Sequence, residues 1–201
     1  MELALLTAIT DLGDSALMLP LALILAMVLW SQQSTAAALA WIGTLLPGLA
    51  IMTTLKLAGL ACGGALDTPD LSPSGHAAFA TMVYGSAAVI VARHTTGVAR
   101  WLAGFAAAGL VVTVSASRLL LEMHTKLEVA VGLIVGGATV ALFASVYRRL
   151  PPATTVRSRG VAVAASLVVL LVVALHGERL HAEDVIRSIA AELRTQVSAC
   201  R

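Results

Sequence analysis

The stretch Leu71-Ser72-Pro73-Ser74-Gly75-His76 interrupts a chain that is otherwise almost entirely apolar on either side of it. A polar segment between two long apolar runs is costly to bury unless its groups have partners or a function. Pro73 and Gly75 favour a tight turn, and His76 opens the next apolar run. The turn therefore brings a serine, a glycine amide and a histidine to a helix N-terminus, where free N–H groups and the helix dipole favour an anion.

A second polar stretch runs from Ser117-Arg118 through His124 to Glu128 and follows two further apolar runs. Arg118 can bind an anion through two parallel hydrogen bonds, and His124 is a candidate nucleophile or base. Glu128 lies four residues after His124, so on a helix the two share a face and the carboxylate can orient the imidazole. The two histidines, the arginine and a turn suited to phosphate together favour phosphoryl transfer.

Together the two stretches resemble motifs of the type 2 phosphatidic acid phosphatase (PAP2) family. Pro73-Ser74-Gly75-His76 is similar to the second family motif, PSGH, and the stretch from Ser117 to Glu128 is similar to the third, SRxxxxxHxxxD. Lys56 stands where the first motif begins with a lysine, but Gly63-Gly64 occupy the positions of its Arg-Pro. The resemblance covers residues 56 to 132.

The resemblance implies a two-step phosphatase mechanism through a phosphohistidine, with no metal or cofactor. His124 would attack phosphorus as a neutral imidazole that Glu128 holds in the required tautomer. His76 would protonate the leaving oxygen and later deprotonate the attacking water. Four groups would bind the phosphate oxygens: Lys56, Ser74, the Gly75 amide and Arg118. As structural alternatives, Ser74 could serve only as a helix N-cap, and Lys56 and Arg118 could reach to lipid headgroups.

Two departures from the family pattern affect the predicted chemistry. Glu128 replaces the usual aspartate, which adds one methylene but leaves the carboxylate within reach of an imidazole. Loss of the first-motif arginine removes a charge-assisted phosphate ligand, which contributes on the order of a few kcal/mol. No other Arg or Lys lies between Lys56 and His76, and Lys126 is the nearby candidate to replace it. The loss predicts a slower enzyme, a preference for a less charged phosphate, or an inactive protein.

The composition indicates an integral membrane protein. Of the 201 residues, 59% are hydrophobic and 12% are charged, whereas soluble domains carry about 25% charged residues. The net charge of +2 is too small to suggest nucleic-acid binding. Cys62 and Cys200 form neither a metal-binding pattern nor a disulfide framework. They could pair if both ends of the chain face an oxidising compartment, but we interpret them as two unrelated thiols.

Apolar runs of membrane-spanning length predict an all-α fold, a polytopic bundle of about six transmembrane helices. The predicted spans cover residues 16–33, 36–61, 76–93, 98–117, 127–147 and 160–176. Residues 3–10 are too short to cross about 30 Å of hydrocarbon and predict an interfacial helix. Residues 1–177 would form the membrane-embedded phosphatase domain, and residues 178–201 an amphipathic helix. This last helix could cover the site, lie on lipid headgroups or form a dimer contact.

Arginines in the predicted loops set the orientation of the bundle. They flank the loops after the third and fifth predicted spans: Arg93, Arg100, Arg148, Arg149, Arg157 and Arg159. The positive-inside rule places these loops in the cytoplasm. Alternation then places both polar stretches and both termini on the opposite face, which in a bacterium is the periplasm. We therefore expect a multi-pass protein of the inner membrane whose active site faces the periplasm.

Three functions remain open from the sequence. The first is a phosphatase that hydrolyses a lipid phosphomonoester or pyrophosphate, with phosphatidate-like lipids, phosphatidylglycerol phosphate or a polyprenyl diphosphate such as undecaprenyl pyrophosphate as substrates. The second is a lipid phosphotransferase, and the third is a catalytically impaired membrane protein that binds a lipid phosphate. Intact His76, Arg118 and His124 oppose the third function, whereas the missing arginine favours it. The expected partners are a lipid phosphate and membrane lipids, without nucleic acid; the oligomeric state is open.

Overall fold

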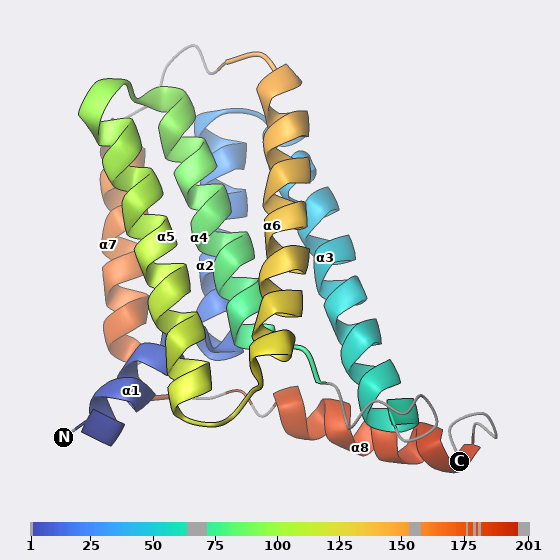
Figure 1. The fold of residues 1–201 in the computed structure, drawn as a ribbon. Coiled ribbons are helices and arrows are strands. Elements are labelled where there is room, and N and C mark those ends of the chain that lie inside the picture. Colours follow the sequence, from blue (N-terminus) through green and yellow to red (C-terminus); the bar gives the residue numbers. More distant parts are fainter. Residues whose placement is uncertain are drawn as a thin grey trace.

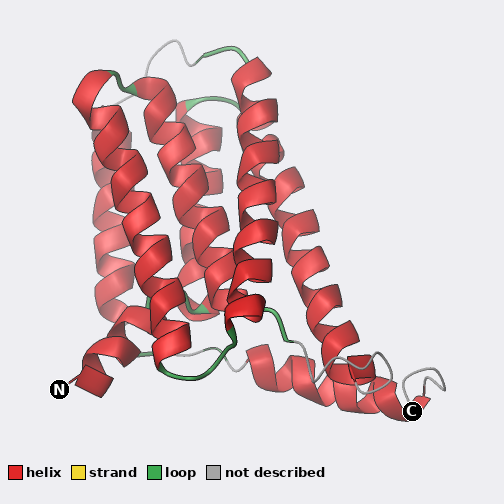
Figure 2. Ribbon diagram, viewed as in Figure 1, coloured by secondary structure: helices red, strands yellow, loops and turns green. Residues whose placement is uncertain are grey.

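The structure is a computed structural model that describes residues 2–63, 72–152, 158–175, 177–178, 180 and 182–196. These residues form eight helices and no strand, which confirms the all-α prediction (Figure 2). The helices are α1 (Glu2–Asp11), α2 (Ser15–Gln32), α3 (Thr35–Cys62), α4 (Gly75–His94), α5 (Gly97–Leu120), α6 (Lys126–Arg149), α7 (Ser158–Ala174) and α8 (Ala182–Gln196). Four residues named above, Gly64, Leu71, Arg157 and Cys200, lie outside the described residues.

Among the described residues, five segments are long and apolar enough to cross a membrane, so the chain is a multi-pass integral membrane protein. They are Leu3–Gln32, which comprises α1 and α2, Thr35–Cys62, Gly75–His94, Gly97–Leu120 and Lys126–Arg149. Each predicted span coincides with a helix to within one helical turn. The sixth, α7, has 17 residues, somewhat short of the roughly 20 that a perpendicular span needs, and it packs along α2 in the bundle (Figure 1).

The helix directions gather both polar stretches at one end of the bundle. Helix α4 lies at its centre and packs against α5, α6 and α2, while α3 packs against α2 and α6 (Figure 1). The C-terminal ends of α3 and α5 therefore lie near the N-terminal ends of α4 and α6. Helix α8 packs on α3 at this same end, and α1 packs on α5 there. At the opposite end, Arg93 donates to the carbonyls of Tyr147 and Leu150 and joins α4 to the end of α6.

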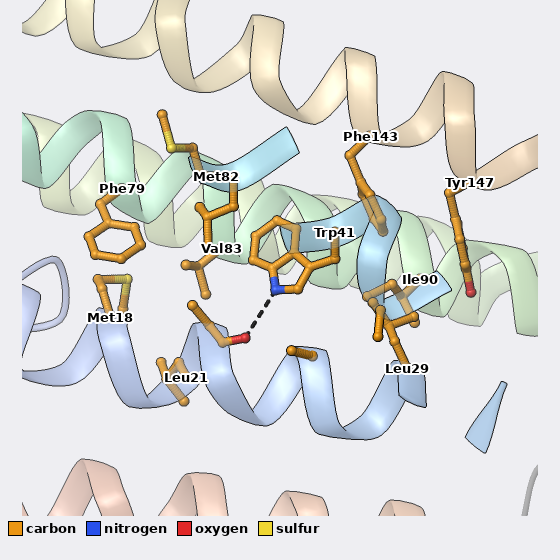
Figure 3. Close-up of a cluster of buried hydrophobic side chains, with 14 of the residues drawn as sticks. Met18, Leu21, Leu29, Trp41, Phe79, Met82, Val83, Ile90, Phe143 and Tyr147 are labelled. Atoms are coloured by element: carbon orange, nitrogen blue, oxygen red, sulfur yellow. Dashed lines mark hydrogen bonds between the residues drawn. The ribbon is translucent and has the colours of Figure 1, made fainter. Parts of the chain in front are cut away.

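An apolar core between α2, α3, α4 and α6 holds these directions (Figure 3). Trp41 of α3 is fully buried, and its indole N–H donates to the carbonyl of Ala22 in α2 at 3.0 Å. Its ring meets the Phe143 ring edge-on at 5.5 Å, and Phe143 stacks on Tyr147 at 5.1 Å between centroids. Because the buried indole N–H has a partner, this aromatic row joins three helices without an unsatisfied polar group.

Two glycines allow α6 to approach α4 closely. A Cβ atom on Gly132 would lie 2.5 Å from the carbonyl oxygen of Ser74, and one on Gly136 would lie 2.8 Å from that of Ala78. Both distances are shorter than any real contact, so only glycine fits at these positions. Two glycines four residues apart on α6 thus permit close packing of the two helices. Since Ser74 precedes α4, the contact at Gly132 also sets the position of the polar turn.

Cys62, the last residue of α3, is disulfide-bonded. The interpretation of the two cysteines as unrelated thiols is therefore wrong for Cys62. The disulfide lies at the same end of the bundle as the polar stretches, shortly after Lys56 along α3. It constrains the end of the helix that carries this lysine.

Replacing Gly136 by alanine tests the close packing of α4 and α6. The new methyl group would overlap the backbone of α4, and overpacking of this kind typically destabilises a protein by about 1–3 kcal/mol. The matched control is Gly137→Ala, because a Cβ there would meet no atom within 4 Å. We expect Gly136→Ala to lower the thermal unfolding temperature in detergent and Gly137→Ala to leave it unchanged or raise it. Equal unfolding temperatures for the two variants would contradict this packing.

Candidate active site

The first half of the site is built at the start of α4. Ser74 is the N-cap of this helix, and its hydroxyl oxygen accepts the N–H of Ala77 at 3.4 Å. Gly75 and His76 follow as the first residues of the helix. The structural alternative for Ser74, an N-cap, is therefore confirmed. It is compatible with phosphate binding, because the hydroxyl hydrogen is still available as a donor.

The second half is built by the turn that follows α5, which returns His124 to Arg118. The N–H groups of Met123 and His124 donate to the Arg118 carbonyl at 3.1 and 3.3 Å, and Glu122 N–H donates to the Leu119 carbonyl at 3.1 Å. This is a Schellman motif with one additional bond. Glu122 adopts the left-handed conformation, with φ 53°, which costs a non-glycine residue about 1–2 kcal/mol. The surrounding contacts must therefore hold Glu122 in this unfavourable conformation.

Glu128 joins the two halves. Its Oε1 accepts the Ser72 N–H at 2.7 Å, and its Oε2 accepts the Thr125 N–H at 2.8 Å. Thr125 in return caps α6 by accepting the Glu128 N–H at 3.3 Å, which completes a capping box. In addition, the Ser74 N–H donates to the Glu128 carbonyl at 3.0 Å. Glutamate is a usual residue at this position of a capping box. The capping box therefore gives a structural reason for Glu128 where the family motif has aspartate.

His124 is buried beside Glu128, with 3.4 Å between Nδ1 and Oε2. No hydrogen bond of ordinary geometry to this Nδ1 occurs among the described residues, so Glu128 acts on the imidazole through its charge. Burial lowers the pKa of His124, and the positive charges of Arg118 and Lys56 lower it further. These effects outweigh the opposing effect of Glu128 on the pKa. The ring is consequently neutral at pH 7, the form in which an imidazole is nucleophilic.

The two cations predicted to bind phosphate are both buried at this end. The Nζ atom of Lys56 lies 3.9 Å from the place that a Cβ on Gly75 would take, and 3.1 Å from Oε2 of Glu183. Arg118 donates from NH1 to the Thr10 hydroxyl at 3.2 Å. The lysine head group therefore lies beside Gly75 at the N-terminus of α4.

Two adjoining cavities open among these residues. The first, about 530 Å³, is lined by Thr10, Asp14, His76, Arg118, Met123, Leu180, Glu183, Asp184 and Arg187. The second, about 480 Å³, begins at Lys56, Gly75 and His76 and continues past apolar side chains of α2, α3, α4 and α8, among them Leu19, Leu49, Met52 and Phe79. His76 lines both cavities. All seven predicted site residues thus lie at one end of the bundle: Lys56, Ser74, Gly75, His76, Arg118, His124 and Glu128.

Asp14 is a site residue that the sequence did not identify. Its Oδ1 accepts the N–H of Ala16, which caps α2, and that of Leu180, at 2.8 and 3.2 Å. Its Oδ2 lies 3.4 Å from Nε2 of His76. A carboxylate at this distance favours the protonated form of the imidazole. The available signal was an aspartate directly before an apolar run, which is typical of an N-cap at a membrane boundary.

Helix α8 covers the site, which was one of three alternatives for the amphipathic segment. Glu183 and Arg187 of α8 line the first cavity. Lys126, considered as a replacement for the missing arginine, is exposed at the start of α6 and lines neither of the two cavities. Arg187 is instead a cation that lines the first cavity together with Arg118.

Comparisons with known proteins give two matches. The model of the PAP2 superfamily matches residues 56–152, a range that contains all seven predicted site residues. A protein of Klebsiella pneumoniae, described as "Uncharacterized 22.5 kDa protein in cps region", is 31% identical over 188 residues, which are 90% of this chain and 88% of that protein. No solved structure matches the chain significantly.

Glu128→Gln tests whether this side chain holds the two halves together. The amide keeps the shape of glutamate but has one acceptor oxygen, so it cannot serve both the Ser72 and Thr125 N–H groups. A buried donor left without its partner costs about 1–3 kcal/mol. We expect a lower thermal unfolding temperature than for wild type, with Glu178→Gln, an exposed glutamate, as the control. An unchanged unfolding temperature for Glu128→Gln would show that these bonds do not hold the site.

Proposed function

Because the chain belongs to the PAP2 superfamily, we propose that it is a membrane phosphatase that hydrolyses a lipid phosphomonoester or pyrophosphate through a phosphohistidine at His124. Members of this superfamily are phosphatases that act in general on lipid phosphates, which supports a phosphoric ester hydrolase. The observation that carries the proposal is the meeting of a buried neutral His124, Arg118 and Lys56 beside the N-terminus of α4.

In the first step, the neutral imidazole of His124 attacks phosphorus. A P–N bond forms, the bond from phosphorus to the leaving oxygen breaks, and His76 gives its proton to that oxygen. The charge on the three equatorial oxygens is stabilised by Lys56, Arg118 and the donors at Ser74 and Gly75. Asp14 supports this step, because its carboxylate stabilises the protonated form of His76 relative to the neutral form.

In the second step, water replaces the leaving group in line with the P–N bond. His76, now neutral, removes a proton from the water as the oxygen attacks phosphorus, and the P–N bond breaks. Inorganic phosphate leaves, His124 is again neutral, and His76 is again protonated. The negative charge of Glu128 stabilises the phosphorylated imidazole between the two steps.

The second cavity supports a lipid substrate. It begins at Lys56 and His76 and continues along apolar surface of α2, α3 and α4. If the phosphate group binds at Lys56 and His76, the hydrocarbon tail of the same lipid would lie against the apolar side chains of this cavity. Phosphatidate-like lipids, phosphatidylglycerol phosphate and polyprenyl diphosphates all have this form, a phosphate head on a long apolar chain.

We place the active site on the periplasmic side of a bacterial inner membrane. Arg93 and Arg148 lie in the last turns of α4 and α6, whose C-terminal ends are opposite the site (Figure 1). The positive-inside rule favours the cytoplasm for this end. The disulfide of Cys62 lies at the site end, and disulfides persist in oxidising compartments such as the periplasm. These two features support the same orientation independently of each other.

Phosphate release by the purified protein tests the proposed function. With EDTA present, the protein in detergent is offered phosphatidate, phosphatidylglycerol phosphate and a polyprenyl diphosphate. We expect release from at least one lipid, because the mechanism uses only side chains, and loss of release in His124→Ala, which lacks the nucleophile. No release from folded wild-type protein, or equal release by His124→Ala, would contradict the proposal.

The pH profile of kcat/KM tests the environment of His124. The attacking imidazole is neutral above its pKa, and burial together with Arg118 and Lys56 lowers that pKa below the ordinary value of 6.5. Activity should therefore persist below pH 6.5 and fall only as the pH passes through the lowered pKa. In Lys56→Gln one lowering charge is removed, so the acid limb should move to higher pH even though the rate falls. An acid limb at the same pH in both proteins would contradict this electrostatic account.

A further inference from the structure

Lys56 is a buried cation whose charge is neutralised from α8. Its side chain is 6% exposed, and its Nζ lies 3.1 Å from Oε2 of Glu183. Burial opposes ionisation of Glu183, but the charge of Lys56 and its hydrogen bond outweigh burial and lower the pKa of this carboxyl group. Glu183 is therefore an anion at neutral pH. A buried lysine without such a counter-charge would be strongly destabilising.

The same carboxylate also contacts a second cation. Oε1 of Glu183 lies 3.5 Å from NH2 of Arg187, one turn further along α8. The Arg187 side chain is 60% exposed, and ion pairs of this kind on a helix surface contribute little to stability. Arg187 also lines the cavity that contains His76 and Arg118. Glu183 thus places a carboxylate between two positive side chains at the edge of the site.

Helix α8 is attached to the bundle at both of its ends. Near its C-terminal end, Arg194 donates to the carbonyls of Ala61 and Leu60 in the last turn of α3, at 3.2 and 2.6 Å. Before its first turn, the Leu180 N–H donates to Asp14 at 3.2 Å. These contacts do not involve Glu183 or Arg187. The two side chains are therefore held at the site by a helix whose attachment does not depend on them.

We propose that the Glu183 carboxylate and the substrate phosphate compete for the same place between Lys56 and Arg187, and that Arg187 supplies the guanidinium that the first motif lacks. A phosphate group carries about −1.5 to −2 charges and three acceptor oxygens, against one charge and two oxygens for the carboxylate. It can therefore displace Glu183 and bridge Lys56 and Arg187. This inference rests on the proposed function, because it assumes that the substrate phosphate contacts Lys56.

Arg187 would replace the family arginine from a distant part of the chain. Gly63, the first of the two residues at the family positions, is the C-cap of α3 and has no side chain. An arginine on α8 can approach the same phosphate from the other side, because α8 packs on α3 at this end. On this proposal, the guanidinium that binds the phosphate comes from α8 instead of the first motif, and the site keeps its activity.

Kinetics of three α8 variants of the full chain test the proposal. Arg187→Gln should raise KM roughly tenfold or more with a smaller change in kcat, because a charge-assisted ligand is lost. Arg187→Lys should recover part of that loss, since it restores the charge without the planar fork. Glu183→Gln should bind inorganic phosphate several-fold more tightly as a product inhibitor, because the competing carboxylate is gone. Glu192→Gln, an exposed glutamate on the same helix, should behave as wild type.

A binding measurement separates failure of this proposal from failure of the proposed function. Inorganic phosphate is titrated into each protein, and the rise in thermal unfolding temperature reports binding without turnover. One outcome is that wild type hydrolyses no lipid, while phosphate raises the unfolding temperature of Arg187→Gln less, and that of Glu183→Gln more, than it raises that of wild type. The phosphatase proposal then fails and the bridging site stands. If Arg187→Gln and Glu183→Gln match Glu192→Gln in both measurements while wild type is active, the proposal for α8 is overturned.

Discussion

Charged groups buried at the end of an apolar bundle must neutralise one another, and this constraint shapes the whole site. Lys56 is paired with Glu183, and His76 lies beside Asp14. Glu128 is held by backbone N–H groups from two segments. Removing one partner would leave the other charge buried and costly. The constraint explains why charged residues of α3, α4, α6 and α8 converge here.

The site residues also complete the ends of the helices that carry them. Asp14 caps α2, Ser74 caps α4, and Thr125 with Glu128 forms the capping box of α6. Each helix end would otherwise leave N–H groups without partners at the boundary of the membrane. The same donors and dipoles that need a cap also favour an anion. Helix geometry thus fixes the positions of the groups that we propose bind phosphate, and close packing at Gly132 brings two of these helix ends together.

The sequence predicted the spans and the seven candidate site residues from local patterns. Long apolar runs determine the helices, and the motif spacing brings His76, His124 and Arg118 to one face of the membrane. It did not identify Asp14, Glu183 or Arg187, since their partners lie far away in the chain and a charged residue on an amphipathic helix most often faces water. The disulfide of Cys62 was missed for a related reason. Cysteine pairing depends on which segments of the chain meet in space, and the spacing of two cysteines in the sequence does not show this.

The central claim is that His124 carries the phosphoryl group during turnover. Its most direct test is to mix the protein with a lipid phosphate labelled in the terminal phosphate, stop the reaction with alkali within one turnover, and locate the label by mass spectrometry. The account predicts label on the peptide that contains His124, stable to alkali and released by acid, as expected of a phosphohistidine. Product formation without label on that peptide, or label on another residue, would contradict it.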